Sequence, residues 1–170
     1  MGPDRACAEW VIRCGGSIRW SRSDELSKEF KSICNKIPGK DYLTAIEATD
    51  ACVNANGMKH LQNVGKLEYL KFDRCFELNN KALQYLSIAK DSLKQVEIYS
   101  CLFSDAGLLH LKDLRKLRIL KMGDLPNAVN IDETIEELKS CLPNCDVTYK
   151  KYENTLTRPT WMEQIFGRKT

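Results

Sequence analysis

Apolar residues recur along the chain with a period of about two dozen positions. Four segments share the spacing apolar-x-x-apolar-x-apolar, and they begin at Leu43, Leu67, Leu93 and Leu117. The starts are 24, 26 and 24 residues apart, which is the period of leucine-rich repeats, each a short strand with a helical return segment. The pattern therefore predicts an α/β fold, a short leucine-rich-repeat solenoid of about four strand–helix rungs.

Cysteines refine the predicted repeat class. Cys75 and Cys101 each follow the last apolar strand position by three residues, where such repeats carry an inward-facing Asn or Cys. In the first rung Ala51 holds that position and Cys52 comes one residue late. Eight cysteines would also suit disulfides in a secreted protein, but the register favours reduced structural residues in a cysteine-containing repeat. Cysteines at this inward-facing position would stack from one repeat to the next, and they are here called ladder cysteines. The predicted ladder cysteines are Cys52, Cys75 and Cys101.

The segments between the predicted strands carry helix signals. Polar pairs Asn79-Asn80 and Ser104-Asp105 precede apolar helical positions, and such residues cap helix starts by accepting bonds from free backbone N–H groups. After the fourth strand, a stripe spaced i, i+4, i+7, i+11 from Ile131 predicts a longer helix. Residues 147–149 could then add a last strand.

Residues 1–42 are expected to cover the first rung as a mainly helical N-terminal cap. Asp4 is the expected cap of a first helix, and a second helix is expected from Ser23 or Asp24, with a short strand at 18–20 between them. The expected inward residues are Ala6, Trp10, Val11 and Cys14 in the first helix, and Leu26, Phe30 and Ile33 in the second. The predicted organisation is thus a cap (1–42), a repeat domain (43–150) and a tail (151–170).

Composition narrows the classes of function. The formal net charge of +3 gives no basic stripe of the kind that nucleic-acid binding needs. No apolar run approaches the length of a membrane span, no targeting segment opens the chain, and no catalytic motif emerges. We therefore expect a non-enzymatic protein. We also expect it to be a monomer with peripheral membrane association at most. The tail, with Trp161, Ile165 and Phe166, is either disordered or a short amphipathic docking helix.

Residues between the core positions of each strand should face the concave surface of the solenoid. They include two tyrosines and charges of both signs, which suits a protein partner better than a phosphate backbone. A solvated face without a partner is the alternative, and Lys71 beside Glu97 could be only a cross-strand pair. The predicted partner-binding residues are Glu47, Tyr69, Lys71, Asp73, Glu97, Tyr99 and Lys121.

The opening of the chain carries a second signal. Residues 2–16, GPDRACAEWVIRCGG, with Ile46–Cys52 and Gly123–Pro126, resemble the mitochondrial coupling factor B (ATP synthase subunit s) family over about 150 residues. A related family, the complex I distal-arm assembly components, resembles the repeats as well, and Leu142-Pro143-Asn144-Cys145 fits it at least equally.

The resemblance implies a coupling or regulatory protein on the matrix side of the inner mitochondrial membrane, in contact with membrane-associated subunits of the proton-translocating ATP synthase. It also implies a bound divalent ion, expected to be magnesium, on the Gly2 carbonyl, Asp4, Thr49 and Asp50. Hard oxygen ligands of this kind suit magnesium. Alternatively, Asp4 only caps its helix and Asp50 only satisfies turn N–H groups.

Two alternative functions remain open on the sequence, an assembly factor for complex I and a substrate-recognition module of a ubiquitin ligase. The second would need a helical F-box before the repeats, which Gly15-Gly16 and the expected strand interrupt. The family resemblance also implies a Cys-x-Cys pair at the end of the second strand. Here that stretch is Asp73-Arg74-Cys75, so a redox-active dithiol is not expected at this place.

Overall fold

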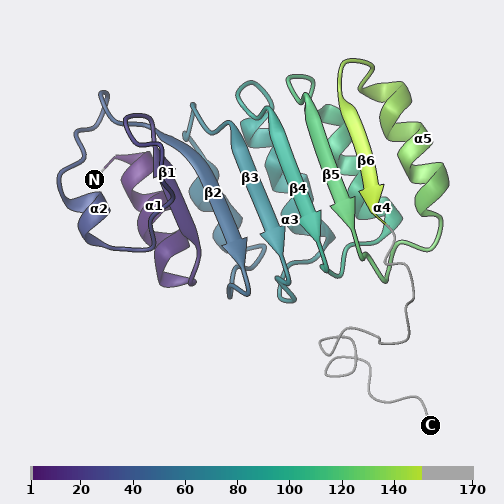
Figure 1. Cartoon of the computed structure of the whole chain (residues 1–170), viewed down its shortest axis with the longest axis horizontal. Helices are drawn as coiled ribbons and strands as arrows, with labels where there is room; N and C mark the ends of the chain where they lie inside the picture. The colour runs from purple at the N-terminus through teal and green to yellow at the C-terminus, as the bar shows by residue number, and fades with distance from the viewer. Residues whose placement is uncertain (1, 151–170) are drawn as a thin grey trace, which may run out of the picture.

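The computed structural model describes residues 2–150. They form a six-stranded sheet whose strands follow one another in chain order, with helices packed against it (Figure 1). Strands β2 to β6 are parallel, and β1 pairs antiparallel with β2 at the N-terminal edge. This sequential parallel order is compatible with a repeat solenoid, because each strand and its return segment contact mainly the next.

The strands are β1 (Ser17–Trp20), β2 (Leu43–Thr49), β3 (Tyr69–Asp73), β4 (Gln95–Tyr99), β5 (Ile119–Gly123) and β6 (Asp146–Lys150). The helices are α1 (Pro3–Arg13), α2 (Lys31–Cys34), α3 (Asn80–Tyr85), α4 (Asp105–Leu108) and α5 (Ile131–Cys141). Short 3-10 helices are η1 (Gly57–Leu61), η2 (Leu86–Ala89) and η3 (Leu109–Asp113). No helix among residues 2–150 combines the length and the apolar content needed to cross a bilayer.

The predicted strand positions are confirmed. All twelve apolar positions of the four repeated segments are buried, none more than 2 % exposed. They stack in register, so that Ile46, Leu70, Val96 and Leu120 lie side by side on successive strands. The alternation of strand side chains explains this result, because every second residue points into the same core. The predicted last strand at 147–149 is also present, as part of β6.

Each parallel strand from β2 to β5 ends in the same backbone bend. Asp50, Arg74, Ser100 and Asp124 occupy equivalent positions and all have φ of 50–51°, a left-handed conformation that non-glycine residues seldom adopt. The N–H groups of Asp50, Arg74 and Ser100 donate to the carbonyl at the end of the next strand, at 3.0–3.1 Å. Such bonds offset the backbone strain, and they show that the backbone repeats with the sequence period.

Helices α3 and α4 lie behind the strands in Figure 1. Asn79 caps α3 as predicted, since its side chain accepts a hydrogen bond from the Lys81 N–H. Asn80 instead links two repeats, because its amide donates to Ser104 Oγ at 2.8 Å and accepts from the Ser104 N–H. Ser104 stands before α4 but makes no side-chain cap bond.

The N-terminal segment differs from its predicted form. Gly2, and not Asp4, is the N-cap of α1, and the Asp4 carboxylate accepts from the Leu43 N–H at 2.8 Å. The core face of the helix is also shifted from the predicted one. Its buried residues are Cys7, Ala8, Val11 and Ile12.

The expected second helix is the larger error, because α2 has only four residues. Leu26 and Phe30, expected inside, are 41 % and 48 % exposed, and only Ile33 is buried. Ser27 exchanges two backbone hydrogen bonds with Ile18 of β1, at 2.9 and 2.7 Å. This extended pairing uses the backbone groups that a helix starting at Ser23 would need.

Candidate functional site

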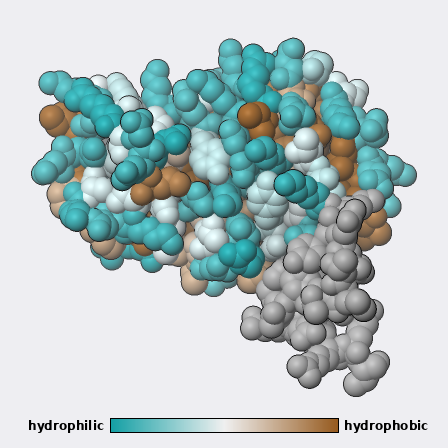
Figure 2. Space-filling model, viewed as in Figure 1, coloured by the Kyte–Doolittle hydropathy of each residue, from teal (hydrophilic) through white to brown (hydrophobic). Residues whose placement is uncertain are grey.

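One row of charged side chains crosses the face of the sheet turned away from α3 and α4, here called the open face. Glu47, Lys71, Glu97 and Lys121 are direct neighbours on β2 to β5, so their charges alternate in sign. Lys71 Nζ lies 2.9 Å from Glu47 Oε1, and Lys121 Nζ lies 3.8 Å from Glu97 Oε1. Lys71 lies beside Glu97 on the adjacent strand as predicted, and its close ion pair is with Glu47. In Figure 2, which shows this face, the surface over the strands is mainly hydrophilic or neutral.

The pKa values of Lys71 and of two neighbouring tyrosines are raised above their ordinary values. Burial alone would lower the pKa of Lys71, but the hydrogen bond and the attraction of Glu47 outweigh it, so the pKa is raised and the ammonium persists. Burial also raises the pKa of the Tyr69 and Tyr99 phenols. Both tyrosines therefore keep their hydroxyl protons and offer hydrogen-bond donors beside the charged row.

A second cluster lies at the bends where β2 and β3 end. Arg74 contacts Asp50 through both Nε and a terminal nitrogen, at 2.7 and 2.8 Å, and contacts Asp73 at 3.0 Å. The bidentate bond lowers the pKa of Asp50, whereas burial raises the pKa of Asp73 despite the nearby guanidinium. Arg74 was not among the predicted residues, although it follows Asp50 by one repeat of 24 residues.

The predicted magnesium ligands do not converge. The Asp4 carboxylate accepts a hydrogen bond from Leu43 at the start of β2, whereas Thr49 is the last residue of this strand and Asp50 follows it. At roughly 3.3 Å per residue, the two ends of this strand are about 20 Å apart. Magnesium ligands lie only about 2.1 Å from the ion, so these residues cannot share one.

The donors are also engaged elsewhere. The Gly2 carbonyl accepts from the Ala6 N–H, Asp50 is held by Arg74, and Thr49 Oγ1 donates to Glu47 at 3.5 Å. Within residues 2–150, no group of three or more His, Cys, Asp or Glu is placed to hold a metal ion. The four residues therefore do not fit a magnesium site in this structure.

Two of the three predicted ladder cysteines are buried. The Cys75 thiol donates to the Ala48 carbonyl and the Cys101 thiol to the Tyr99 carbonyl, each at 3.2 Å. Burial raises the pKa of Cys75 to about 11, which suits an unreactive core thiol. Cys52 is exposed, and Ala51 is buried in its place. The prediction for Cys52 as an inward residue was wrong.

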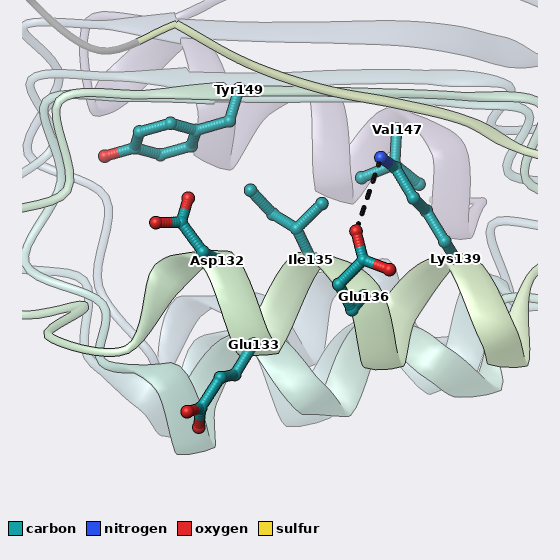
Figure 3. Close-up of a pocket in the computed structure, with 7 residues that line it drawn as sticks. All are labelled: Asp132, Glu133, Ile135, Glu136, Lys139, Val147 and Tyr149. Atoms are coloured by element: carbon teal, nitrogen blue, oxygen red, sulfur yellow. Dashed lines mark ion pairs between the residues drawn. The ribbon is translucent and has the colours of Figure 1, made fainter.

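A groove of about 820 Å³ separates α5 from β6 at the C-terminal end of the sheet (Figure 3). Ile135 and Val147 form its apolar floor, and Lys139 lies 4.0 Å from Glu136 across its rim. The other lining residues are Asp132, Glu133 and Tyr149. Three of these seven lining residues are carboxylates, so the groove is a mainly acidic surface with an apolar floor.

No family model matches the chain. Curated relatives named "ATP synthase subunit s, mitochondrial" do. The protein of Rattus norvegicus is 30% identical over 155 residues, and the Homo sapiens and Bos taurus proteins are 29% and 28% identical over 151 residues. Each alignment covers 86% of this chain and 76% of the relative. At this identity and coverage, the chain belongs to the mitochondrial ATP synthase subunit s (coupling factor B) family.

Proposed function

We propose that this protein is a non-catalytic accessory protein of the mitochondrial proton-translocating ATP synthase, acting by protein contact on the matrix side of the inner membrane. The names of its relatives support the complex and the organelle. The proposed role is coupling or regulation, carried out by a monomer that binds membrane-associated subunits of the synthase.

We further propose that residues 43–150 are a leucine-rich-repeat solenoid of the cysteine-containing type and that residues 1–42 act as its cap. The sequential parallel strands, the recurring bends and the buried Cys75 and Cys101 support this assignment. The predicted tail, 151–170, lies outside the described residues.

The observation that carries the functional proposal is the alternating row on the open face. Lys121 is the most exposed member, with 46 % of its side chain accessible, whereas Glu47, Lys71 and Glu97 are between 15 % and 24 % exposed. Partly buried, paired charges are pre-ordered, so a partner meets a fixed pattern at a low cost in side-chain entropy. Flanking tyrosines Tyr69 and Tyr99 supply the amphipathic surface that is enriched in protein interfaces.

Affinity capture from mitochondria tests this proposal. The wild-type chain is expected to recover ATP synthase subunits. Lys121→Glu is expected to recover none, because it replaces the positive charge beside Glu97 with a second carboxylate. Lys90→Glu is the matched control, since Lys90 is an exposed lysine after η2, on the helical side. Equal loss in both variants would contradict a contact through the open face.

The same experiment separates the alternative functions. Recovery of complex I assembly intermediates without ATP synthase would indicate an assembly factor for that complex. Recovery of ubiquitin-ligase subunits without respiratory-chain proteins would indicate a substrate-recognition module. Either result would overturn the proposed function.

A further inference from the structure

Exposed apolar side chains concentrate in one short part of the N-terminal segment. Six large apolar residues are exposed among residues 2–150, and three of them lie within twelve residues of each other. They are Leu26, Phe30 and Ile37, which are 41 %, 48 % and 51 % exposed. Single exposed apolar residues are ordinary, but a cluster of them marks a binding surface.

Phe30 and the Ile37-Pro38 turn lie at opposite ends of helix α1, and Leu26 precedes Ser27, which pairs with Ile18 of β1. Phe30 packs under the Arg13 guanidinium at the end of the helix, 5.6 Å from its ring centre. Pro38, next to Ile37, lies against Gly2 at the helix start, where a Cβ on Gly2 would meet the Pro38 ring at 3.3 Å. An 11-residue helix is about 16 Å long. The segment from Phe30 to Ile37, which includes α2, therefore runs along α1 at the N-terminal end of the molecule in Figure 1, and this segment with Leu26 is here called the strip.

Lysines are interleaved with this strip. Lys28, Lys31, Lys36 and Lys40 fall between residues 26 and 40, with Glu29 as the acidic residue of that stretch. Residues 26–40 thus carry +3, and the carboxylates of Asp24, Glu25 and Asp41 border this stretch on its two sides. Lys31 pairs with Glu29 at 2.7 Å, Lys36 lies over the Trp20 ring, and Lys28 and Lys40 are exposed.

We propose that this strip, Leu26, Phe30 and Ile37 with the lysines around them, docks on an anionic phospholipid surface. Interfacial segments combine apolar side chains that enter the headgroup boundary with lysines that contact anionic headgroups. Protein interfaces, in contrast, are depleted in lysine, and the open face lies on other residues. The strip needs lipid alone, so this inference goes beyond the proposed function and does not depend on it.

Vesicle sedimentation with the full chain tests the inference. The probes are phosphatidylcholine vesicles with and without phosphatidylglycerol. The chain is expected to sediment with the anionic vesicles only, and less at high salt, because screening weakens the lysine contacts. No sedimentation with anionic vesicles at low salt would overturn the proposal and leave a protein as the occupant of the strip.

Substitutions that leave the net charge unchanged distinguish binding through the apolar side chains of the strip from binding by charge alone. Phe30→Asn and Ile37→Asn together are expected to weaken vesicle binding at least about tenfold, because two apolar side chains no longer enter the boundary. Ile88→Asn and Val129→Asn together are the matched control, since these residues are 42 % and 83 % exposed on other parts of the surface. Unfolding midpoints near that of the wild type would verify folding. Equal binding by both double variants, or equal loss, would overturn the proposal.

Discussion

Asp105 joins the last two repeats, and removing its carboxylate should measurably weaken the fold. One oxygen accepts from the N–H groups of Val129 and Asn130, at 2.9 and 3.1 Å, and the other accepts from Thr134 Oγ1 at 2.9 Å. Thr134 is 4 % exposed, whereas Val129 and Asn130 are exposed. Asp105→Ala therefore leaves one buried hydroxyl unpaired and two N–H groups that water can reach.

The magnitude follows from these three bonds. A buried polar group left unpaired costs about 1–3 kcal/mol, and each replaceable bond contributes roughly 0.5 kcal/mol or more. We expect Asp105→Ala to lower the free energy of unfolding by about 2–4 kcal/mol, measured by denaturant titration. Asp91→Ala, at an exposed aspartate, is the control and should change it by no more than about 0.5 kcal/mol.

A double-mutant cycle tests the mechanism. Thr134→Val removes the buried hydroxyl, so Asp105→Ala should cost about 1 kcal/mol less in that background than in the wild type. Two results would refute the reasoning. One is a loss in Asp105→Ala no greater than in Asp91→Ala, and the other is strict additivity of the two substitutions.

Three further predictions follow from the described contacts. Maleimide should label the exposed thiols of Cys34, Cys52 and Cys141 in the folded protein. It should label Cys75 and Cys101 only after unfolding, because burial raises the pKa of these two thiols. Mass spectrometry of the labelled peptides checks this. Gly57→Ala should destabilise the protein by about 1–3 kcal/mol in thermal or denaturant unfolding, because the new Cβ would meet the Trp10 ring, which stacks on His60. Arg74→Ala should raise the pKa of Asp50 towards its ordinary value in an NMR titration. In the wild type, the lowered pKa of Asp50 stabilises the folded state at pH values above the unfolded-state pKa, and this stabilisation is lost as the pH falls through the folded-state pKa. The variant lacks this contribution, so its free energy of unfolding should fall less in acid than that of the wild type.

The strands could be predicted from the sequence because their information is local. Alternating apolar residues in Leu67–Phe72 and its counterparts bury one face whatever lies elsewhere, and the 24-residue period sets the register. The repeat period also contains the information that predicts the cluster of Asp50, Asp73 and Arg74 at the bends. Asp50 and Arg74 are one period apart, so parallel stacking places their opposite charges side by side.

The N-terminal segment could not be predicted in the same way because distant contacts decide it. Leu26, Phe30 and Ile33 have helical spacing, but the pairing of Ser27 with Ile18 prevents a helix there. Asp4 is a natural helix cap by residue type, but its carboxylate binds Leu43, 39 residues away. No local pattern indicates either contact.

Cys75 and Cys101 are buried as predicted, and the prediction for Cys52 was wrong because of its backbone position. Cys52 is one residue past the inward position, and that single step turns it to solvent. The expected magnesium ligands Asp4 and Asp50 were joined by resemblance, and only the extended geometry of β2 reveals that they lie at its opposite ends.

Site-specific photo-crosslinking in mitochondria tests the central claim most directly. A photoreactive residue in place of Lys121 would sample the open face, and the same residue in place of Ile88, in η2, would sample the helical side. The proposal predicts crosslinks to ATP synthase subunits from position 121 and none from position 88. Crosslinks to complex I subunits alone, or to ATP synthase from position 88 alone, would contradict it.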